Sequence, residues 1–414
     1  MGQAYNGQWA LAWLLAIPVL LIAIPAAILV VQGGSGIVSR LLDSRVLVAL
    51  IVLDLGLLGW RLVAILQAHS ERSRLTLRGW PTWLTAVLVL VTIGMHALPA
   101  YYASKAIDTL GSVALEGGGG LGGRTEGRAI DVAPPSIQPE VDDGERVAVL
   151  LAGVDFAPGR SHHLTDTMLV ATLDPVTGEG AMVSIPRDLY GAPLGDGRIY
   201  NAKLNSLLAT ASADPATYPV GGPATLKAAI GELLGTRIHY FAAIDIEGLR
   251  QVIDTIGGVE VTVERTIDDP RYADELTGQR GFYLEAGPQH LDGYTALAYA
   301  RSRMSAGESD FTRAERQQVL LTAIAEKLTA GNLLVTLPGL LDAVRDNVAT
   351  DIPSGRIPDI AAEIQDADLG GLEQVVLAPP EYVTVKPNSA AGYILIPNVE
   401  AILELGERIF EAPR

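Results

Sequence analysis

The chain of 414 residues contains no cysteine, which excludes a disulfide framework and catalysis by a thiol. Basic residues are also scarce, with 30 Lys and Arg against 47 Asp and Glu. Because the first 103 residues hold six of these basic residues and three of the acidic ones, the remainder carries an excess of 20 negative charges. Nucleic-acid binding depends on basic patches, so this charge balance argues against a nucleic-acid partner.

Charge of either sign is nearly missing from long stretches of the first hundred residues. Three apolar runs occur there, near residues 9–31, 46–66 and 83–103. Each is long enough to cross about 30 Å of hydrocarbon as a helix. The first has no basic segment before it and two more runs follow, so we interpret it as a span and not as a cleaved signal peptide. Residues 1–103 are therefore predicted to form a membrane region with three transmembrane helices.

The second run contains two charged residues, Asp54 and Arg61. They lie about two helical turns apart on one face, so they either pair with each other or face a neighbouring helix. The loop after this run carries Arg72, Arg74 and Arg78 against one glutamate. Since the more basic loop is expected on the cytoplasmic side, we predict a cytoplasmic N-terminus and an extracytoplasmic domain after the third span.

Residues 104–145 are rich in glycine and proline and are predicted to form a flexible linker. From residue 146 onward, apolar runs bounded by turn residues predict strands at 147–154, 167–173, 180–185, 240–246, 259–263 and 374–377. Helices are predicted at 226–234, 247–256, 290–300, 311–328, 333–344, 357–365 and 399–410. Strands interleaved with helices indicate an α/β/α sandwich with a mixed central sheet over residues 146–414.

Five polar fragments lie at the ends of these elements: 153–155, 165–167, 184–188, 300–303 and 310–318. Each has an ordinary explanation as a turn, a cap, an ion pair or a charge at a helix end. The last one indicates more. Asp310, Arg313 and Gln317 share one helix face, and the same stripe continues as Leu320 and Ile324, which must face the core. An inward-facing arginine at a helix start is typical of an anion site.

The fragments together supply guanidinium groups from Arg187, Arg301, Arg303 and Arg313. Arginine binds phosphate through two parallel hydrogen bonds. Carboxylates such as Asp155 and Asp166 suit Mg²⁺. This set is typical of phosphoryl transfer, where positioning and charge neutralisation dominate. No Ser–His–Asp order or nucleophile elbow is present. The adjacent His162 and His163 point to different sides, so we favour solvent exposure over a metal site for them.

In their order and spacing, these fragments resemble the LytR-CpsA-Psr (LCP) family. The resemblance covers about residues 146–414. The segments that carry it are 149–155, 165–168, 183–188, 203–205, 256–259, 291–293, 298–303 and 310–318.

The resemblance implies a phosphotransferase that moves a glycopolymer of the teichoic acid, capsule or arabinogalactan type from a polyprenyl-pyrophosphate carrier to peptidoglycan. It implies Mg²⁺ as cofactor and a hydrophobic pocket for the lipid between sheet and helices. By position, Asp155, Asp166 and Arg187 match the catalytic centre, and Asp155, Asp166 and Asp310 match the metal site. The pyrophosphate-binding positions are matched by Arg187, Arg301, Arg303, Arg313, Gln317 and Lys203.

The chain departs from the family pattern at Leu164, where an arginine is usual, at Thr165, where the family has serine, and in its number of spans. Arg160, His162 and His163 are candidates to supply the charge missing at Leu164. Two other functions stay open: a phosphohydrolase that uses water in place of a sugar hydroxyl, and a non-catalytic protein that binds or senses polyprenyl phosphates. A transcription regulator is disfavoured by the acidic charge and the predicted location outside the cytoplasm.

Overall fold

The computed structural model describes residues 8–17, 43–74, 82–113, 141, 145–154, 164–274, 277–305, 307–330, 339–340, 342–344, 347–353 and 355–410. The chain divides into two compact units, Met1–Leu110 with Ile357–Ala362, and Gly111–Arg356 with Glu363–Arg414. The first unit contains the apolar helices and the second contains the core of the α/β domain.

Two helices of the first unit, α4 (Ser44–Arg74) and α5 (Thr82–Val113), are long and apolar. Within the described residues these two, and not three, have the length and hydropathy needed to cross a membrane. The first predicted span falls mostly on residues 18–42, outside the described residues. Helix α5 continues to Val113, so the predicted start of the linker at residue 104 is wrong. The apolar run ends near there, but no glycine or proline interrupts the helix between that point and Gly111.

A polar network joins the two apolar helices. His96 of α5 is buried, and its Nδ1 lies 2.7 Å from Oδ1 of Asp54 on α4. Its Nε2 lies 3.4 Å from Nη1 of Arg61. Of the two interpretations of Asp54 and Arg61, the one in which they face a neighbouring helix is therefore confirmed. Closer to the loop, Thr85 Oγ1 lies 3.0 Å from His69 Nδ1. The network thus fixes the register of two surfaces that otherwise consist mainly of apolar side chains.

We expect His96→Leu to loosen the pairing of α4 and α5, because Asp54 and Arg61 lose the ring that joins them. Polar contacts between membrane helices contribute about 0.6 kcal/mol and up to about 1.7 kcal/mol. Since the chain has no cysteine, a pair introduced at positions 69 and 85 reports the pairing as disulfide yield in detergent. That yield should fall in His96→Leu and stay unchanged in Met95→Leu, whose side chain is exposed. Equal yields in the two variants would contradict the role of the network.

The α/β unit is built on one mixed sheet of order β11-β6-β1-β2-β3-β12. In that order its strands are Val348–Thr350, Tyr240–Asp245, Val147–Val154, Thr165–Leu173, Gly180–Ser184 and Glu373–Val376. The neighbours β1–β6 and β3–β12 are parallel, whereas β1–β2, β2–β3 and β6–β11 are antiparallel. The predicted mixed sheet is confirmed, and the consecutive strands β2 and β3 form a hairpin.

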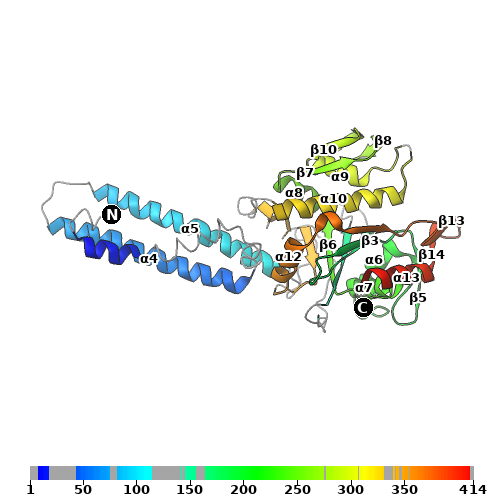
Figure 1. The fold of residues 1–414 in the computed structure, drawn as a ribbon, viewed down its shortest axis with the longest axis horizontal. Helices are drawn as coiled ribbons and strands as arrows, with labels where there is room; N and C mark the ends of the chain where they lie inside the picture. Colours follow the sequence, from blue (N-terminus) through cyan, green and yellow to red (C-terminus); the bar gives the residue numbers. More distant parts are fainter. Residues whose placement is uncertain are drawn as a thin grey trace. The chain divides into compact units, whose positions relative to one another are not determined.

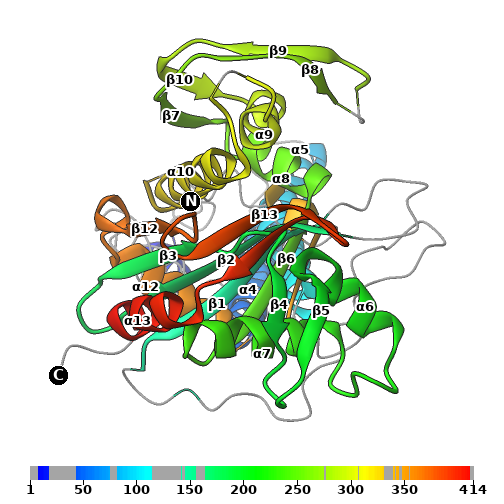
Figure 2. The ribbon, with the colours of Figure 1, turned by 90° about the vertical axis from the view of Figure 1, so that its right-hand side faces the viewer.

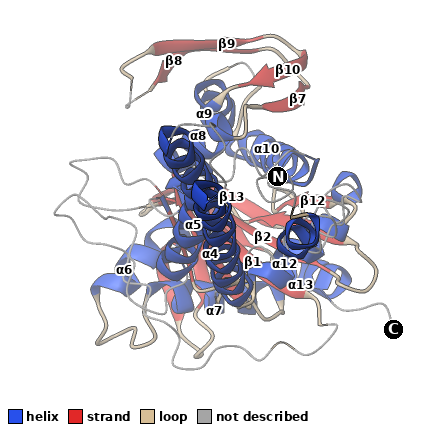
Figure 3. Cartoon of the chain, turned by 90° about the vertical axis from the view of Figure 1, so that its left-hand side faces the viewer, coloured by secondary structure: helices blue, strands red, loops and turns tan. Residues whose placement is uncertain are grey.

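Helices cover both faces of this sheet, which makes three layers (Figures 1 and 2). On one face lie α7 (Gly222–Leu234) and α13 (Val399–Phe410), and α6 (Leu207–Ala213) packs on α7. On the other face lie α8 (Ile246–Thr255) and α10 (Asp310–Ala330). Figure 3 shows the red strands of the sheet between α10 and α7. Buried side chains of β1 such as Leu150 and Ala152 join the core on the α7 side.

A second, smaller core lies on the outer side of α8 and α10. It is formed by α9 (Gly293–Arg301) and two strand pairs, and it includes Ile253, Val261, Leu291 and Leu320. The strand pairs are β7 (Val259–Val263) with β10 (Gly287–Leu291), and β8 (Ile267–Ala273) with β9 (Arg280–Leu284). Two further hairpins, β4 (Tyr190–Pro193) with β5 (Ile199–Lys203) and β13 (Val383–Ser389) with β14 (Gly392–Pro397), and helix α12 (Ile357–Asp366) complete the elements.

The helix predicted from residue 290 starts later, at Gly293. Residues 287–291 form β10, and Asp292 ends that strand by capping the helix: its carboxylate accepts a hydrogen bond from the Thr295 amide at 2.8 Å. An aspartate at the N-cap satisfies an amide that has no partner inside the helix. The helix predicted at 333–344 lies largely outside the described residues.

Candidate functional site

A cavity of about 730 Å³ lies between the sheet and helices α8, α9 and α10. Seven of the predicted site residues line it: Asp166, Arg187, Lys203, Arg301, Arg303, Arg313 and Gln317. The polar residues come from the ends of strands and helices. Apolar residues from within the elements, such as Leu151, Leu169 and Leu321, line the rest. The cavity therefore has a charged end and an apolar body.

A β-bulge positions Asp166. Gly153 of β1 is opposite Thr167, and Val154 is opposite Thr165, so Asp166 has no partner in the ladder. A bulge leaves one residue unpaired and turns its side chain out of the regular alternation. A Cβ atom at Gly153 would lie 3.0 Å from the Cβ of Thr167. The small residue before the predicted catalytic segment therefore allows the two strands to approach.

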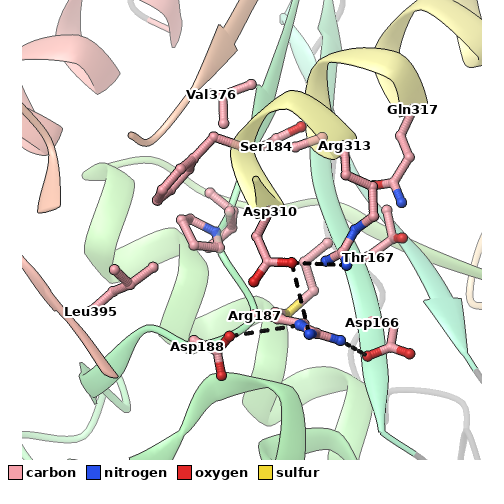
Figure 4. A pocket seen from close by; sticks show the side chains of 15 residues that line it. Asp166, Thr167, Ser184, Arg187, Asp188, Asp310, Arg313, Gln317, Val376 and Leu395 are labelled. Carbon is pink, nitrogen blue, oxygen red and sulfur yellow. Dashed lines mark hydrogen bonds and ion pairs between the residues drawn. The ribbon is translucent and has the colours of Figure 1, made fainter. Parts of the chain in front are cut away.

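Arg187 lies in the turn that follows β3 and is the centre of an ion-pair network (Figure 4). Its Nη1 donates to Oδ1 of Asp166 at 2.7 Å. Its Nη2 lies 3.8 Å from Oδ1 of Asp310, and its Nε lies 3.7 Å from Oδ2 of Asp188. The turn itself is fixed because the Asn205 amide donates to the Arg187 carbonyl at 3.1 Å. One guanidinium group thus joins carboxylates from β2, from α10 and from its own turn.

The first turn of α10 supplies Asp310 and Arg313. Ser309 and Thr312 cap the helix reciprocally: the Thr312 amide donates to Ser309 Oγ at 3.2 Å, and the Ser309 amide donates to Thr312 Oγ1 at 2.9 Å. Arg313 is buried, and its Nη1 lies 2.9 Å from Oδ1 of Asp310. The same oxygen therefore faces both Arg187 and Arg313, as Figure 4 shows.

The electrostatic environment of the two arginines differs. Burial opposes the charged form of Arg187, but Asp166, Asp310 and Asp188 outweigh it and raise the pKa of this guanidinium. Burial lowers the pKa of Arg313, and the nearby charges of Arg187 and Arg303 lower it further. Asp310 and Asp166 act to raise this pKa, but they do not balance the other effects. Arg313 is therefore a buried cation with two other arginines near it, and an incoming anion would favour its charged form.

Arg301 and Arg303 lie on the turn that ends α9, and their backbone is held by three other side chains. Gln317 Nε2 donates to the Ala300 carbonyl at 3.3 Å, and Arg316 donates to the Ser302 carbonyl. Asp269 of β8 accepts from the other side, with one oxygen, Oδ2, bonded to Ser302 Oγ at 2.8 Å and to the amides of Arg303 and Met304 at 3.1 Å.

Neither Arg301 nor Arg303 has a carboxylate within ion-pair distance among the residues that the structure describes. Their backbone is fixed, and their guanidinium groups keep most of their N–H donors, although Arg301 also contacts the Tyr272 hydroxyl. The positions of these two arginines are therefore set in advance without occupying the atoms that would bind a ligand.

Lys203, the least certain of the predicted residues, lies at the end of β5. Its Nζ donates to Oδ1 of Asp188 at 2.7 Å. The prediction included Asp188 in the fragment 184–188 but gave it no role in the site, although it directly follows Arg187 in the sequence. It also overlooked Asp269, Arg271 and Tyr272, three residues of β8 that line the cavity. No motif surrounds them and strand β8 itself was not predicted, so no sequence signal pointed to them.

Asp155 lies outside the described residues, as do Arg160, His162 and His163. Asp310 lines a small pocket that adjoins the cavity and shares Asp166, Arg187 and Arg313 with it. Within the described part of the chain, no group of three or more His, Cys, Asp or Glu is arranged to hold a metal ion. Two part-exposed carboxylates, Asp166 and Asp310, are present. This donor set fits Mg²⁺, which takes one or two carboxylates and completes its shell with water and substrate phosphates.

The fold and the site together define a class: an α/β protein with a cavity that has arginines and carboxylates at one end and apolar walls beyond them. The LytR_cpsA_psr family model matches residues 124–390. Because this match covers more than half of the chain, the protein belongs to that family.

Two similar proteins are named polyisoprenyl-teichoic acid–peptidoglycan teichoic acid transferases. TagV of Bacillus subtilis (strain 168) is 29% identical over 65% of this chain and 62% of its own length. TagU of Bacillus cereus (strain AH820) is 29% identical over 56% of this chain and 69% of its own length. The crystal structure of B. subtilis TagV superposes with a TM-score of 0.52 at 21% identity, over 66% of this chain and 99% of that one, which supports the fold.

We expect Asp269→Asn to lower the free energy of unfolding by about 1–3 kcal/mol at neutral pH. Burial raises the pKa of Asp269, but the hydrogen bonds from Ser302, Arg303, Met304 and Arg271 outweigh it and lower the pKa. A carboxylate with a lowered folded-state pKa stabilises the fold above its unfolded-state pKa, and this contribution is lost as the pH falls through the folded-state pKa.

Urea unfolding at pH 7 and at acidic pH measures the free energy of unfolding of both proteins. The difference in this free energy between wild type and Asp269→Asn should become smaller on acidification. Asp268→Asn, an exposed neighbour on the same strand, should behave like the wild type at both pH values. A difference in free energy of unfolding that does not depend on pH would contradict a role for the ionised carboxylate.

Proposed function

We propose that the protein transfers a glycopolymer from a polyprenyl-pyrophosphate carrier to peptidoglycan. The observation that carries the proposal is the meeting of Arg187, Arg301, Arg303 and Arg313 at the charged end of one cavity. Two joined phosphates carry several negative charges, and guanidinium groups bind them with directed pairs of hydrogen bonds. The names of the relatives, which act on polyisoprenyl-linked teichoic acid and peptidoglycan, agree with this donor and acceptor.

The apolar body of the cavity is the proposed site of the lipid chain. Along α10 the lining changes from Arg313 and Gln317 to Leu320 and Leu321. Leu151 and Leu169 contribute the opposite wall from the sheet. The volume lies within the range of small-molecule sites, which are mostly apolar with a few placed polar groups. A ligand with an anionic head and a hydrocarbon tail matches this division, whereas a free nucleotide or sugar phosphate would leave the apolar walls unused.

In the proposed reaction, a sugar hydroxyl of peptidoglycan attacks the phosphorus atom that bears the glycopolymer. A new oxygen–phosphorus bond forms, the bond to the bridging oxygen breaks, and polyprenyl phosphate leaves with the electron pair. Asp166, of which 43% is exposed, orients the attacking hydroxyl or accepts its proton. Arg187, held against Asp166 and Asp310, stabilises charge on the phosphate oxygens. The product is a phosphodiester between the polymer and peptidoglycan.

Asp166 and Asp310 are the described residues that would hold Mg²⁺, and Asp155 is a third ligand by prediction from the sequence. When bound, the ion would supply charge neutralisation at the phosphates. The remaining contribution comes from the chain itself, because its own hydrogen bonds position the turn after α9 and the start of α10. Positioning and charge neutralisation are the main contributions to phosphoryl transfer.

The proposed location follows from the membrane region. Helices α4 and α5 have the length and hydropathy to cross a bilayer. Arg72 and Arg74 at the end of α4, with Arg78 after it, predict a cytoplasmic location for that side by the positive-inside rule. The α/β domain then lies outside, where peptidoglycan is found. A membrane anchor also suits a polyprenyl-linked donor, which is itself held in the membrane by its hydrocarbon chain.

We expect Arg301→Ala to reduce transfer by about a hundredfold, because removing one preorganised donor to a transition-state oxyanion typically costs about 10²–10³ in rate. The assay uses the purified full-length protein with a labelled lipid-linked donor and peptidoglycan. Arg280→Ala, at an exposed arginine of β9, is the matched control and should retain full activity. Turnover of Arg301→Ala equal to that of the control would count against the assignment. Release of free polymer phosphate in place of a peptidoglycan conjugate would identify a phosphohydrolase.

We expect a chelator to abolish turnover and added Mg²⁺ to restore it. Asp166→Asn should need more Mg²⁺ for half-maximal turnover, and its maximal turnover should fall by about a hundredfold or more if Asp166 also acts on the hydroxyl proton. Asp196→Asn changes an aspartate on the surface that is paired with Arg198. This variant should need the same Mg²⁺ concentration as the wild type for half-maximal turnover. Bound polyprenyl phosphate together with no Mg²⁺-dependent turnover would favour a binding or sensing protein.

A further inference from the structure

Strand β8 forms one wall of the charged end of the cavity, and Tyr272 is its largest side chain there. Tyr272 is 7% exposed, and its ring lies 5.8 Å from that of Phe282 on β9. The pairing of β8 with β9 is irregular between Asp269 and Ala273. Because of this irregularity, Asp269 and Tyr272 both turn inward, although residues three apart on a regular strand face opposite sides.

The Tyr272 hydroxyl is buried and has no well-aligned hydrogen bond with any residue in the described part of the chain. It lies beside the guanidinium of Arg301, whose charge and side-chain hydrogen bond both act to lower the pKa of Tyr272. A guanidinium only donates hydrogen bonds, so this contact leaves the hydroxyl proton of Tyr272 without an acceptor among the described residues. A buried hydroxyl whose proton has no acceptor is unusual, because losing the bonds to water is costly unless another group replaces them. The hydroxyl proton of Tyr272 is therefore available to a ligand that enters the cavity.

The chemistry of the pair indicates what it binds. Burial raises the pKa of Tyr272 to about 12, against the opposing effect of Arg301, so the hydroxyl stays protonated and donates at physiological pH. Arg301 adds N–H donors and a fixed positive charge. Two adjacent donors, one neutral and one cationic, match an oxygen atom with negative charge and several lone pairs. In a cavity that is charged at this end and apolar beyond it, a phosphate oxygen meets that description.

We propose that Tyr272 is a further binding residue of this site and donates its hydroxyl to a phosphate oxygen of polyprenyl pyrophosphate beside Arg301. This inference rests on the proposed function, since it assigns the new residue to the same donor. Strand β8 then contributes to the site through two of its side chains. Asp269 holds the turn that carries Arg301, and Tyr272 contributes a ligand, so the strand sets the position of one donor relative to the other.

Tyr272→Phe tests the proposal because it removes the hydroxyl and keeps the ring that packs on Phe282. Isothermal titration of the full-length protein in detergent measures the affinity for two probes, inorganic pyrophosphate and geranyl pyrophosphate. We expect the variant to bind both probes about tenfold more weakly, as for loss of one hydrogen bond to a charged group. Tyr283→Phe is the matched control, since Tyr283 lies on β9 with an exposed side chain, and it should bind both probes like the wild type.

The outcomes separate this inference from the proposed function. Equal affinity of Tyr272→Phe and wild type for both probes overturns the inference and leaves the proposed function in place. Weaker binding of geranyl pyrophosphate alone also overturns it, because Tyr272 would then shape the apolar cavity and not contact phosphate. Wild-type protein that binds neither probe overturns the proposed function, and the inference with it. The urea unfolding midpoint of Tyr272→Phe should equal or exceed that of the wild type, and a lower midpoint would show that the hydroxyl has a partner within the fold.

Discussion

The arginine cluster at one end of the cavity depends on Asp310, which shares its charge between two of the guanidinium groups. Asp310 faces both Arg187 and Arg313 with a single oxygen. Burying Arg313 without this partner would leave a desolvated cation beside two others, which is among the most costly arrangements in a protein interior. Burial still lowers the pKa of Arg313, and the nearby charges of Arg187 and Arg303 act in the same direction. A locally cationic cavity therefore persists in a domain that is strongly acidic as a whole.

The cluster is fixed in two different ways, and the difference has consequences for ligand binding. Arg187 and Arg313 are held by ion pairs through their side chains, so a ligand must share them with Asp166 and Asp310. Arg301 and its neighbour Arg303 are held through the backbone, by Asp269, Arg316 and Gln317, and no carboxylate among the described residues pairs with their guanidinium groups. Their donors need no rearrangement before they bind an anion. Preorganised donors of this kind contribute most when charge develops during a reaction.

The sequence allowed most of the central sheet, the arginine positions and the helix start at residue 310 to be predicted, because apolar periodicity and clustered charges are local signals. The walls of the site could not be predicted in the same way. Strand β8 reads Ile-Asp-Asp-Pro-Arg-Tyr-Ala and has no apolar alternation, so neither the strand nor Asp269 and Tyr272 gave a signal. Their inward orientation depends on an irregular pairing with β9 that forms only in the folded chain. Similarly, the spacing of Asp54 and Arg61 indicated a shared face, but only the structure identified His96 as their partner.

Helix α10 links the two halves of the cavity in one rigid element. Arg313, Gln317 and Leu320 lie on one face at successive turns, so the change from charged to apolar lining occurs over a few residues of a single helix. Any change in the tilt of α10 would move the phosphate-facing and tail-facing groups together. On the proposed function, helix α10 then sets the distance between the groups that contact the head group and the groups that contact the start of the hydrocarbon chain. Because every polyprenyl pyrophosphate joins its hydrocarbon chain directly to the phosphate, this fixed spacing suits the whole class of carriers and does not select a chain length.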